Sequence, residues 1–409
     1  MSAINQTLKD IQAEARRCLY CVDAPCQKGC PASVDVAQFI RHLRYADVKS
    51  AKRVIKQANP LGGICGTLCP SEELCQKNCT MGRCGAPIHI RDLQKYACAN
   101  ASYSPALPQP NGKRVAVVGA GPAGLGCAAA LAALGYQVEI FEKDGCAAGV
   151  VAREIPGYRI SAAVVENDLA ELPGDRVHIH YDSPVTAEDI AGKLSKEYDA
   201  VFVGAGLSAD RMSGVDIAPG APVAGCSRFL AELKSGTVKS VSGTVVVIGG
   251  GDSAIDAVCS SLACGADKAV LAYRRSREEM PACDEEFLSA ADKGVELMYM
   301  VSPVSITAEG DGAAVTFVRN RLVERPGESR KGFEPVPGSE FTIRASQVVF
   351  AIGKTADTAL LAGKADPDTL RVGDTNCFAG GDYLSGGATV VRAVADGKKA
   401  AAGIHAYLS

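Results

Sequence analysis

Two stretches of this 409-residue chain run from a strand-like segment into a glycine cluster and then into an alanine-rich, helix-like segment. The clusters, Gly119–Gly124 and Gly249–Ala254, lie about 130 residues apart. This order is the unit that binds a dinucleotide, because the helix N-terminus offers free N–H groups and a positive dipole to a pyrophosphate. Two such units predict two related nucleotide-binding domains in an α/β chain.

The first unit has glycines at the three positions that a dinucleotide turn needs. The first permits the tight turn, the second lets the backbone approach a pyrophosphate, and the third allows close packing of helix on strand. The next strand-like run ends in Glu142, where a carboxylate can bind ribose hydroxyls, although a surface glutamate at a strand end is the alternative. The unit therefore predicts FAD binding at Gly119, Gly121, Pro122, Ala123, Gly124 and Glu142.

The second unit differs at the end of its second strand-like run, which leads into Arg274 and Arg275 and has no acid. A carboxylate there would repel a 2′-phosphate, whereas guanidinium groups bind it through charge-assisted bonds. The second unit therefore predicts NADPH in preference to NADH, and a solvated basic turn is the alternative. Its expected contacts are Gly249, Gly251, Asp252, Ser253, Ala254, Arg274 and Arg275.

Ten of the 17 cysteines fall within the first 98 residues, and no apolar signal segment precedes them. In a reducing compartment such clusters are more often metal ligands than disulfides. One array spans residues 18–30 and another spans 65–79, each with short spacings and a Cys-Pro pair. Zinc would favour two CxxC pairs or added histidines. The spacing is instead typical of ferredoxin-like [4Fe–4S] binding, and eight cysteines would suffice for two clusters.

The overall composition excludes several other classes of protein. The formal charge of −3 gives no basic field for nucleic acid. No apolar run reaches the ~18 residues that a membrane span needs. With 47% apolar and 22% charged residues, the chain is expected to be globular. Because the first 17 residues lack an apolar signal core, it is also expected to be cytoplasmic.

The cysteine-rich region resembles a known family. Residues 16–31 read Arg-Arg-Cys-Leu-Tyr-Cys-Val-Asp-Ala-Pro-Cys-Gln-Lys-Gly-Cys-Pro, followed later by Asn-Pro-Leu-Gly at 59–62 and Leu-Gln at 93–94. These motifs resemble the N-terminal half of dihydropyrimidine dehydrogenase and its separate bacterial electron-input subunit, with the glutamate synthase small subunit a more distant relative. The resemblance covers essentially the whole chain.

This resemblance implies an α/β fold with a helical N-terminal iron–sulfur domain and two Rossmann-like domains, the second inserted in the first (the two-dinucleotide flavoprotein fold). The expected boundaries are 1–104 for two [4Fe–4S] clusters, 112–226 with 351–409 for FAD, and 227–350 for NAD(P)H. It also implies interleaved cluster ligands in which a glutamine replaces one cysteine, so that Cys65 is not a ligand. One set would be Cys18, Cys21, Cys26 and Cys79, and the other Cys30, Cys69, Cys75 and Gln94.

The same resemblance assigns further FAD and linker residues. Asp382 would bind the ribityl chain, and the helix after it would point its N-terminus at the flavin. Arg159 would contact the pyrophosphate, and the family's Gly-Gly appears here as Ala148-Gly149. The remaining expected contacts are Gly149, Gly206, Gly353, Gly381, Thr389 and Val390.

The implied activity is transfer of hydride from NADPH to FAD, and then of single electrons through the two clusters to a partner, with no side chain acting as acid or base. No FMN barrel follows the second unit, so we expect a hetero-oligomer with an FMN-containing catalytic subunit that reduces uracil or thymine. A glutamate synthase large subunit or another reductase is the alternative partner. A scaffold that binds flavin only structurally is a further alternative. A disulfide reductase is excluded, because no CxxC pair follows residue 21.

Overall fold

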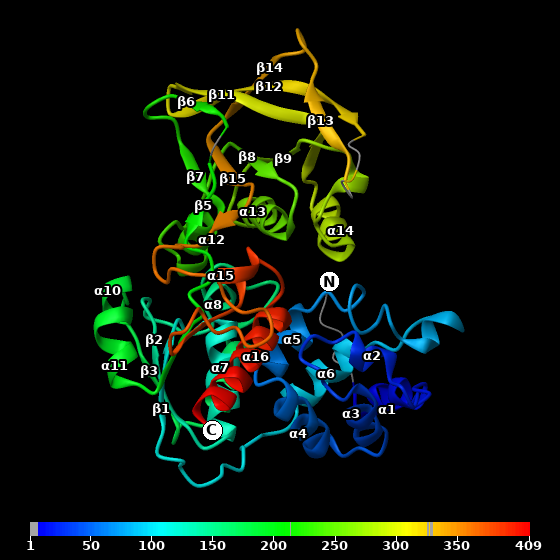
Figure 1. The fold of residues 1–409 in the computed structure, drawn as a ribbon. Coiled ribbons are helices and arrows are strands. Elements are labelled where there is room, and N and C mark those ends of the chain that lie inside the picture. The colour runs from blue at the N-terminus through cyan, green and yellow to red at the C-terminus, as the bar shows by residue number, and fades with distance from the viewer. Residues whose placement is uncertain (1–6, 213, 325–326, 328–329) are drawn as a thin grey trace. The chain divides into compact units, whose positions relative to one another are not determined.

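The computed structural model describes residues 7–212, 214–324, 327 and 330–409 (Figure 1). The chain forms two compact units. Unit 1 contains the described residues of Met1–Ala152, Gly157–Ser208 and Ala356–Ser409, and unit 2 contains those of Arg153–Pro156 and Ala209–Thr355. Since the chain returns to unit 1 at Ala356, unit 2 is an insertion, and the predicted fold class is confirmed. Among the described residues, no helix is long and apolar enough to cross a bilayer.

The N-terminal part of unit 1 is helical. Capping carboxylates start its helices: Asp35 and Asp47 each accept a backbone N–H bond from the third residue of the helix that follows. Apolar residues at helix spacing, such as Phe39 and Leu43, are fully buried between the helices. The elements are α1 (Leu8–Arg16), α2 (Pro25–Lys28), α3 (Val36–Arg44), α4 (Val48–Ala58), α5 (Gly62–Leu68), η1 (Thr80–Arg83) and α6 (Ile90–Ala99).

The rest of unit 1 is built on a parallel five-stranded sheet of order β17-β4-β1-β2-β3. Its strands are β1 (Arg114–Val118), β2 (Gln137–Phe141), β3 (Val177–His180), β4 (Ala200–Val203) and β17 (Cys377–Ala379). Helices α7 (Pro122–Ala133) and α16 (Val390–Leu408) run side by side against it (Figure 1). Their backbones touch where a Cβ on Gly397 would lie 2.0 Å from the Ala123 carbonyl oxygen.

Shorter helices and turns complete unit 1. They are α8 (Val150–Arg153), which ends in unit 2, α9 (Ala162–Ala170), α10 (Ala187–Asp189), a π-helical turn (Ile190–Leu194), α11 (Ser195–Glu197) and α15 (Asp382–Ser385).

A buried ionic network joins the helical part of unit 1 to its sheet-containing part. Asp168 of α9 is 0% exposed and accepts backbone N–H bonds from Gly63 (3.1 Å) and Ile64 (2.8 Å) at the start of α5. Its carboxylate also pairs with the buried Lys56 of α4 at 2.8 Å. Because every member is paired, the network can hold α5 in a single position.

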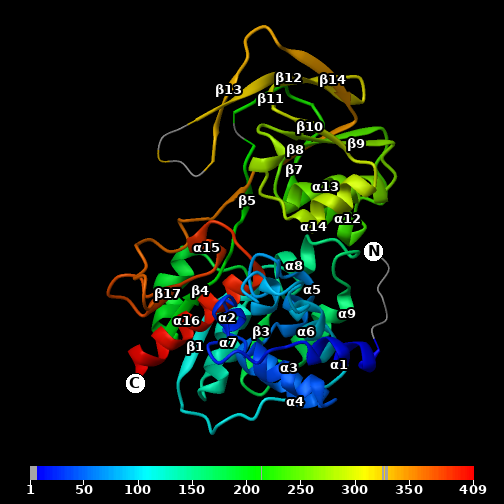
Figure 2. The ribbon, with the colours of Figure 1, turned by 90° about the vertical axis from the view of Figure 1, so that its right-hand side faces the viewer.

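Unit 2 has three layers (Figure 2). Its middle layer is a parallel sheet of order β10-β9-β8-β15-β7. Successive residues of β8 face opposite sides: Val245 and Val247 pack against the helices, whereas Val246 and Ile248 pack against an antiparallel sheet. The parallel strands are β7 (Val223–Gly225), β8 (Thr244–Gly249), β9 (Lys268–Tyr273), β10 (Glu296–Tyr299) and β15 (Gln347–Ala351). The helices are α12 (Cys226–Ser235), α13 (Asp252–Ala263), η3 (Arg277–Glu279) and α14 (Asp284–Asp292).

The antiparallel layer of unit 2 consists of β11 (Val301–Glu309), β12 (Gly312–Val323), β13 (Gly332–Pro335) and β14 (Phe341–Ala345), and the short β6 (Asp216–Ile217) adds to its edge in parallel with β11. A short two-stranded sheet, β5 (Ala209–Asp210) with β16 (Lys354–Thr355), lies where the chain enters and leaves the unit. The main segment of unit 2, residues 209–355, is longer than the nucleotide domain expected at 227–350. The boundaries of the nucleotide-binding domain stay a prediction.

Candidate cofactor sites

The turn between β1 and α7 accepts only glycine at two of its three motif positions. Gly119 has φ +97°, and a Cβ there would lie 2.8 Å from the Gly204 carbonyl oxygen. A Cβ on Gly124 would lie 1.9 Å from the Gly119 carbonyl oxygen. By contrast, a Cβ on Gly121 would meet no protein atom within 4 Å. The backbone of Gly121, followed by Pro122 at the start of α7, is therefore open to a ligand.

Glu142 lies directly after β2 and is 6% exposed. One carboxylate oxygen accepts the N–H of Ala120 in the turn at 2.7 Å, and the other accepts the N–H of Asp144 at 3.0 Å. Glu142 thus holds the turn while its oxygens keep further lone pairs for a ribose. Gly149 also approaches the turn, since a Cβ there would lie 3.2 Å from the Gly121 Cα.

The C-terminal segment comes to the same turn. A Cβ on Gly381 would lie 2.6 Å from the Ala123 Cβ. The next residue, Asp382, accepts the N–H of Ala388 at 3.0 Å, and Thr389 caps α16 by accepting the N–H of Arg392. The structure therefore brings the predicted residues Gly381, Asp382, Thr389 and Val390 to the side of unit 1 that carries the glycine turn. Arg159 and Gly206 lie in the same unit and are half-buried.

The turn between β8 and α13 repeats this design in unit 2. A Cβ on Gly249 would lie 2.3 Å from the Ala351 carbonyl oxygen, whereas one on Gly251 would meet nothing within 4 Å. The third motif position is Ala254, which is fully buried. Asp252 accepts the N–H of Cys283 at 2.9 Å, and Ser253, beside it at the start of α13, is exposed. Gly353 has φ +108° and belongs to the linker into β16.

Arg274 and Arg275 follow β9, on the strand next to this second turn. Their guanidinium carbons lie 5.0 and 5.6 Å from the ring centre of Phe333, on β13. Burial, and then the charge of Arg275, lowers the pKa of Arg274. Phe333 was missed by the sequence analysis, because nothing near it in the chain indicates that β13 returns to β9.

The first predicted cysteine set lies together near α1 and η1. Burial raises the pKa of Cys26 to about 11, and the next largest contribution comes from Cys79. The pKa of Cys18 is raised by burial and also by Cys79 and Cys21. The Cys21 thiol donates to the Thr80 hydroxyl at 3.2 Å. Each of the four thiols thus influences, or is influenced by, at least one other, and their assignment to one cluster stays a prediction.

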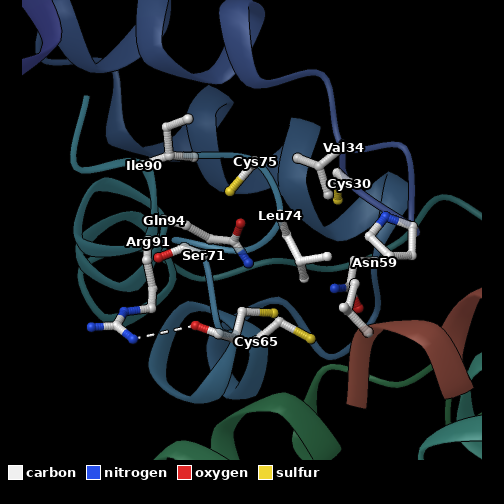
Figure 3. A pocket seen from close by; sticks show the side chains of 13 residues that line it. Cys30, Val34, Asn59, Cys65, Ser71, Leu74, Cys75, Ile90, Arg91 and Gln94 are labelled. Atoms are coloured by element: carbon white, nitrogen blue, oxygen red, sulfur yellow. Dashed lines mark hydrogen bonds between the residues drawn. The ribbon is translucent and has the colours of Figure 1, made fainter. Parts of the chain in front are cut away.

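The second predicted set lines a pocket in unit 1 (Figure 3). Cys30, Cys69 and Cys75 reach it from three segments, and Gln94 points into it from α6. The Gln94 side-chain nitrogen donates to the Gly62 carbonyl oxygen at 2.7 Å. Burial raises the pKa of Cys75 to about 12, with Cys30 the next contributor. The structure therefore brings together the donors of the predicted second cluster.

Cys65 lines the same pocket, so five donors and not four surround it. A hydrogen bond donated by the Cys69 thiol to the buried Cys65, followed by burial, raises the pKa of Cys69. The cysteines of the chain are free thiols. Within the described ranges, no three His, Cys, Asp or Glu side chains converge on a position for a single metal ion. Two sets of half-buried thiols fit iron–sulfur clusters, whose thiolates are spread over several iron atoms, better than zinc.

Comparison with known families agrees with this geometry. Residues 113–397 match the family described as "Pyridine nucleotide-disulphide oxidoreductase". The chain belongs to this family. Residues 2–104 match the description "Dihydropyrimidine dehydrogenase domain II, 4Fe-4S cluster". The predicted class, an NAD(P)H-dependent flavin and iron–sulfur oxidoreductase, is therefore confirmed.

Individual relatives support the same family. The chain is 33% identical to the "NAD-dependent dihydropyrimidine dehydrogenase subunit PreT" of Escherichia coli K12, over 97% of this chain and 93% of that protein. It is 35% identical to the "NADP(+)-dependent formate dehydrogenase subunit beta" of Moorella thermoacetica, over 95% of this chain but 60% of that protein. The small chain of the NADPH glutamate synthase of E. coli K12 is 29% identical, over 97% of this chain and 91% of that one.

Among solved structures, FprA of Mycobacterium tuberculosis in complex with NADPH matches with a TM-score of 0.63. The match covers 73% of this chain and 85% of FprA at 18% identity, and it shows the two-dinucleotide fold.

Proposed function

We propose that this chain is the electron-input subunit of a dihydropyrimidine dehydrogenase. It would take reducing equivalents from NADPH and deliver them to an FMN-containing catalytic subunit that reduces uracil or thymine, in a cytoplasmic hetero-oligomer. The observation that carries the proposal is the 33% identity to PreT along nearly the full length of both chains, iron–sulfur region included.

The residues of unit 1 fit FAD. When bound, FAD would supply acceptance of a hydride and release of single electrons. The open backbone at Gly121 and the N-terminus of α7 would face its pyrophosphate. Glu142 would accept hydrogen bonds from the ribose hydroxyls, and Asp382 would bind the ribityl chain. The N-terminus of α16 at Thr389 would face the flavin.

The two cysteine sets fit two [4Fe–4S] clusters, with Cys18, Cys21, Cys26 and Cys79 holding one and Cys30, Cys69, Cys75 and Gln94 the other. Because the Gln94 nitrogen is bound to the Gly62 carbonyl, the Gln94 oxygen is the atom left to act as a ligand. Val391, in the first turn of α16, lines the pocket of the second set. We therefore assign the second set to the side of the iron–sulfur region nearest the flavin-binding segment.

The choice between Cys65 and Gln94 can be tested by iron content. Two clusters hold about eight irons, so Cys75→Ser is expected to lose about half of the iron, and Gln94→Leu to lose or alter the same cluster. Cys65→Ser is the matched variant and is expected to keep the full content and an unchanged electron paramagnetic resonance spectrum. If Cys65→Ser loses iron as Cys75→Ser does, Cys65 is a ligand and Gln94 is not required.

We propose NADPH as the preferred donor, although PreT is named as NAD-dependent. The support is the pair Arg274 and Arg275 at the end of β9. No carboxylate of the described residues pairs with either guanidinium, so both charges remain for a phosphate.

A second candidate is that the chain feeds a different reductase or dehydrogenase. The relative named as a formate dehydrogenase subunit is slightly more similar than PreT, and it is named as NADP(+)-dependent. The glutamate synthase small chain is a further relative of this kind. In this case the electron transfer from the nicotinamide nucleotide through FAD to the clusters would be the same, and only the partner subunit would differ.

The deciding experiment uses the anaerobic holoprotein in a stopped-flow instrument. We expect NADPH to bleach the flavin faster than NADH, with cluster absorbance following. Addition of an FMN-containing pyrimidine reductase subunit and uracil should then give NADPH-dependent dihydrouracil. Flavin reduction without dihydrouracil formation would favour the second candidate, and no flavin reduction by either nucleotide would refute electron input itself.

A further inference from the structure

The arginine pair after β9 is held in place by the antiparallel layer of unit 2. The Asn320 side-chain nitrogen, on β12, donates to the Arg274 carbonyl oxygen at 2.9 Å. The backbone N–H of Met300 donates to the Arg275 carbonyl oxygen at 3.1 Å. Asn320 is 6% exposed, so the contact is shielded from water. Both backbone positions are thus tied to residues that follow them in the chain by more than 20 positions.

The side chains are held by the same layer. Phe333 of β13 pairs with Leu322 of β12, which places its ring beneath both guanidinium groups, at 5.0 Å for Arg274 and 5.6 Å for Arg275. The Arg275 Nε also donates to the Lys331 carbonyl oxygen at 2.7 Å. An aromatic face attracts a cation at such distances without neutralising it. The ring therefore orients the arginines without supplying a counter-charge.

A nearby arginine shows the contrasting arrangement. Arg277 is paired with the carboxylate of Asp284 and lies 4.0 Å from the ring centre of Phe287. Its charge is compensated, whereas Arg274 and Arg275 have an aromatic partner and no acid within the part of the chain that the structure describes. Of the three arginines in this turn, only the pair on Phe333 is arranged to receive an anion.

We propose that Phe333 determines nucleotide specificity as a positioning residue, by holding Arg274 and Arg275 where they meet the 2′-phosphate of NADPH. The inference rests on the proposed preference for NADPH. Two free arginine side chains would lose rotamer entropy when they bind a phosphate, and a preformed stack removes part of that cost. NADH carries only an uncharged hydroxyl at this position, so its binding should depend little on the stack.

A matched pair in the same sheet provides the control. Arg319 of β12 lies 5.3 Å from the ring centre of Phe341 on β14, an arginine–phenylalanine stack of the same kind. Among the described residues, neither Arg319 nor Phe341 makes one of the contacts given above to Arg274 or Arg275. A general effect on the antiparallel layer should therefore appear in Phe341→Leu as well as in Phe333→Leu.

The test measures binding of 2′,5′-ADP, which carries the 2′-phosphate, and of 5′-AMP, which lacks it, to the holoprotein by calorimetry. Phe333→Leu keeps the apolar bulk but removes the aromatic face. It should weaken the binding affinity for 2′,5′-ADP by about three- to ten-fold and change the affinity for 5′-AMP by less than about two-fold. Phe333→Tyr should restore wild-type affinity, and Phe341→Leu should leave both ligands unchanged. In turnover with ferricyanide, KM for NADPH should rise while kcat and the NADH parameters stay constant.

Several outcomes would overturn the proposal. If Phe333→Leu binds 2′,5′-ADP like wild type while an Arg274→Ala/Arg275→Ala variant does not, the arginines act without the ring. If Phe333→Leu weakens the binding of 2′,5′-ADP and of 5′-AMP equally, Phe333 supports the fold of unit 2 and does not position the arginines for the phosphate. If wild-type protein fails to distinguish the two ligands, the NADPH preference itself fails, and with it the role of Phe333.

Discussion

The two dinucleotide units have the same backbone plan and differ in how they are held. In both, the middle glycine, Gly121 or Gly251, has open space where a Cβ would point. The third position is Gly124 in the first unit and Ala254 in the second. The helix of the first unit, α7, lies too close to its own turn for a side chain there, whereas α13 accommodates a methyl group.

The units differ more at the residue that follows their second strand. Glu142 after β2 accepts two N–H bonds from residues of its own turn region. Arg274 after β9 is instead held by β12 and β13, far along the chain. This contrast leads us to expect that the glycine turn supplies pyrophosphate binding in both units, while the strand-end residue and its support select which nucleotide is bound.

The largest effect is expected from removing the difference at the third position. Gly124→Ala places a Cβ 1.9 Å from the Gly119 carbonyl oxygen, so the turn must move. We expect most FAD to be lost and NADPH oxidation to fall by about a hundred-fold or more, because overpacking at a rigid backbone contact costs about 1–3 kcal/mol or more before any ligand is bound. Flavin content per protein, measured by absorbance after denaturation, checks this.

The reverse change in the second unit is the control. Ala254→Gly removes only a methyl group and adds backbone freedom to α13, for a cost of about 1 kcal/mol in stability. Flavin content should stay at the wild-type value. Full FAD occupancy in Gly124→Ala would show that the first turn is not the FAD site.

The next effect is expected from giving the second unit the acid of the first. Arg274→Glu replaces a guanidinium that would bind the 2′-phosphate by a carboxylate that would repel it. We expect kcat/KM for NADPH to fall by about ten- to a hundred-fold, since a hydrogen bond to a charged group contributes about 1.5–3 kcal/mol. The value for NADH should stay constant or rise.

The control for this change is Arg344→Ala, which removes an exposed arginine paired with Glu309 in the same unit. Neither nucleotide should be affected by it. An equal loss for NADPH and NADH in Arg274→Glu would instead mean that Arg274 supports the fold of the β9 end and does not read the phosphate.

The sequence predicted what depends on neighbouring residues and missed what depends on distant ones. Strand, glycine turn and helix follow one another in the chain, so both units could be anticipated, and their assignment to FAD and NADPH stays a prediction. Phe333 and Asn320 contact Arg274 only because β12 and β13 fold back over β9. The pairing of Lys56 with Asp168, 112 positions apart, has no local signal either.

The cysteines show the same limit. Their spacing indicated iron–sulfur binding, yet spacing alone favoured Cys65 as much as its neighbours. Only family resemblance pointed to Gln94, which the structure places in the same pocket.

The smallest effect is expected at Glu142, where the comparison predicts a structural as well as a ligand role. Glu142→Gln turns one oxygen into an N–H donor that faces the N–H of either Ala120 or Asp144, so one buried hydrogen bond is lost at a cost of about 1–3 kcal/mol. We expect FAD to dissociate about five-fold more readily, measured by the recovery of flavin fluorescence, and the melting temperature to fall.

Glu139→Gln is the control, because Glu139 lies on the same strand but is bonded to Arg114, Tyr198 and His180. It should lower the stability of the fold without releasing FAD. Equal flavin release in both variants would mean that Glu142 acts only through the stability of β2, and that the first unit, unlike the second, does not select its nucleotide at the strand end.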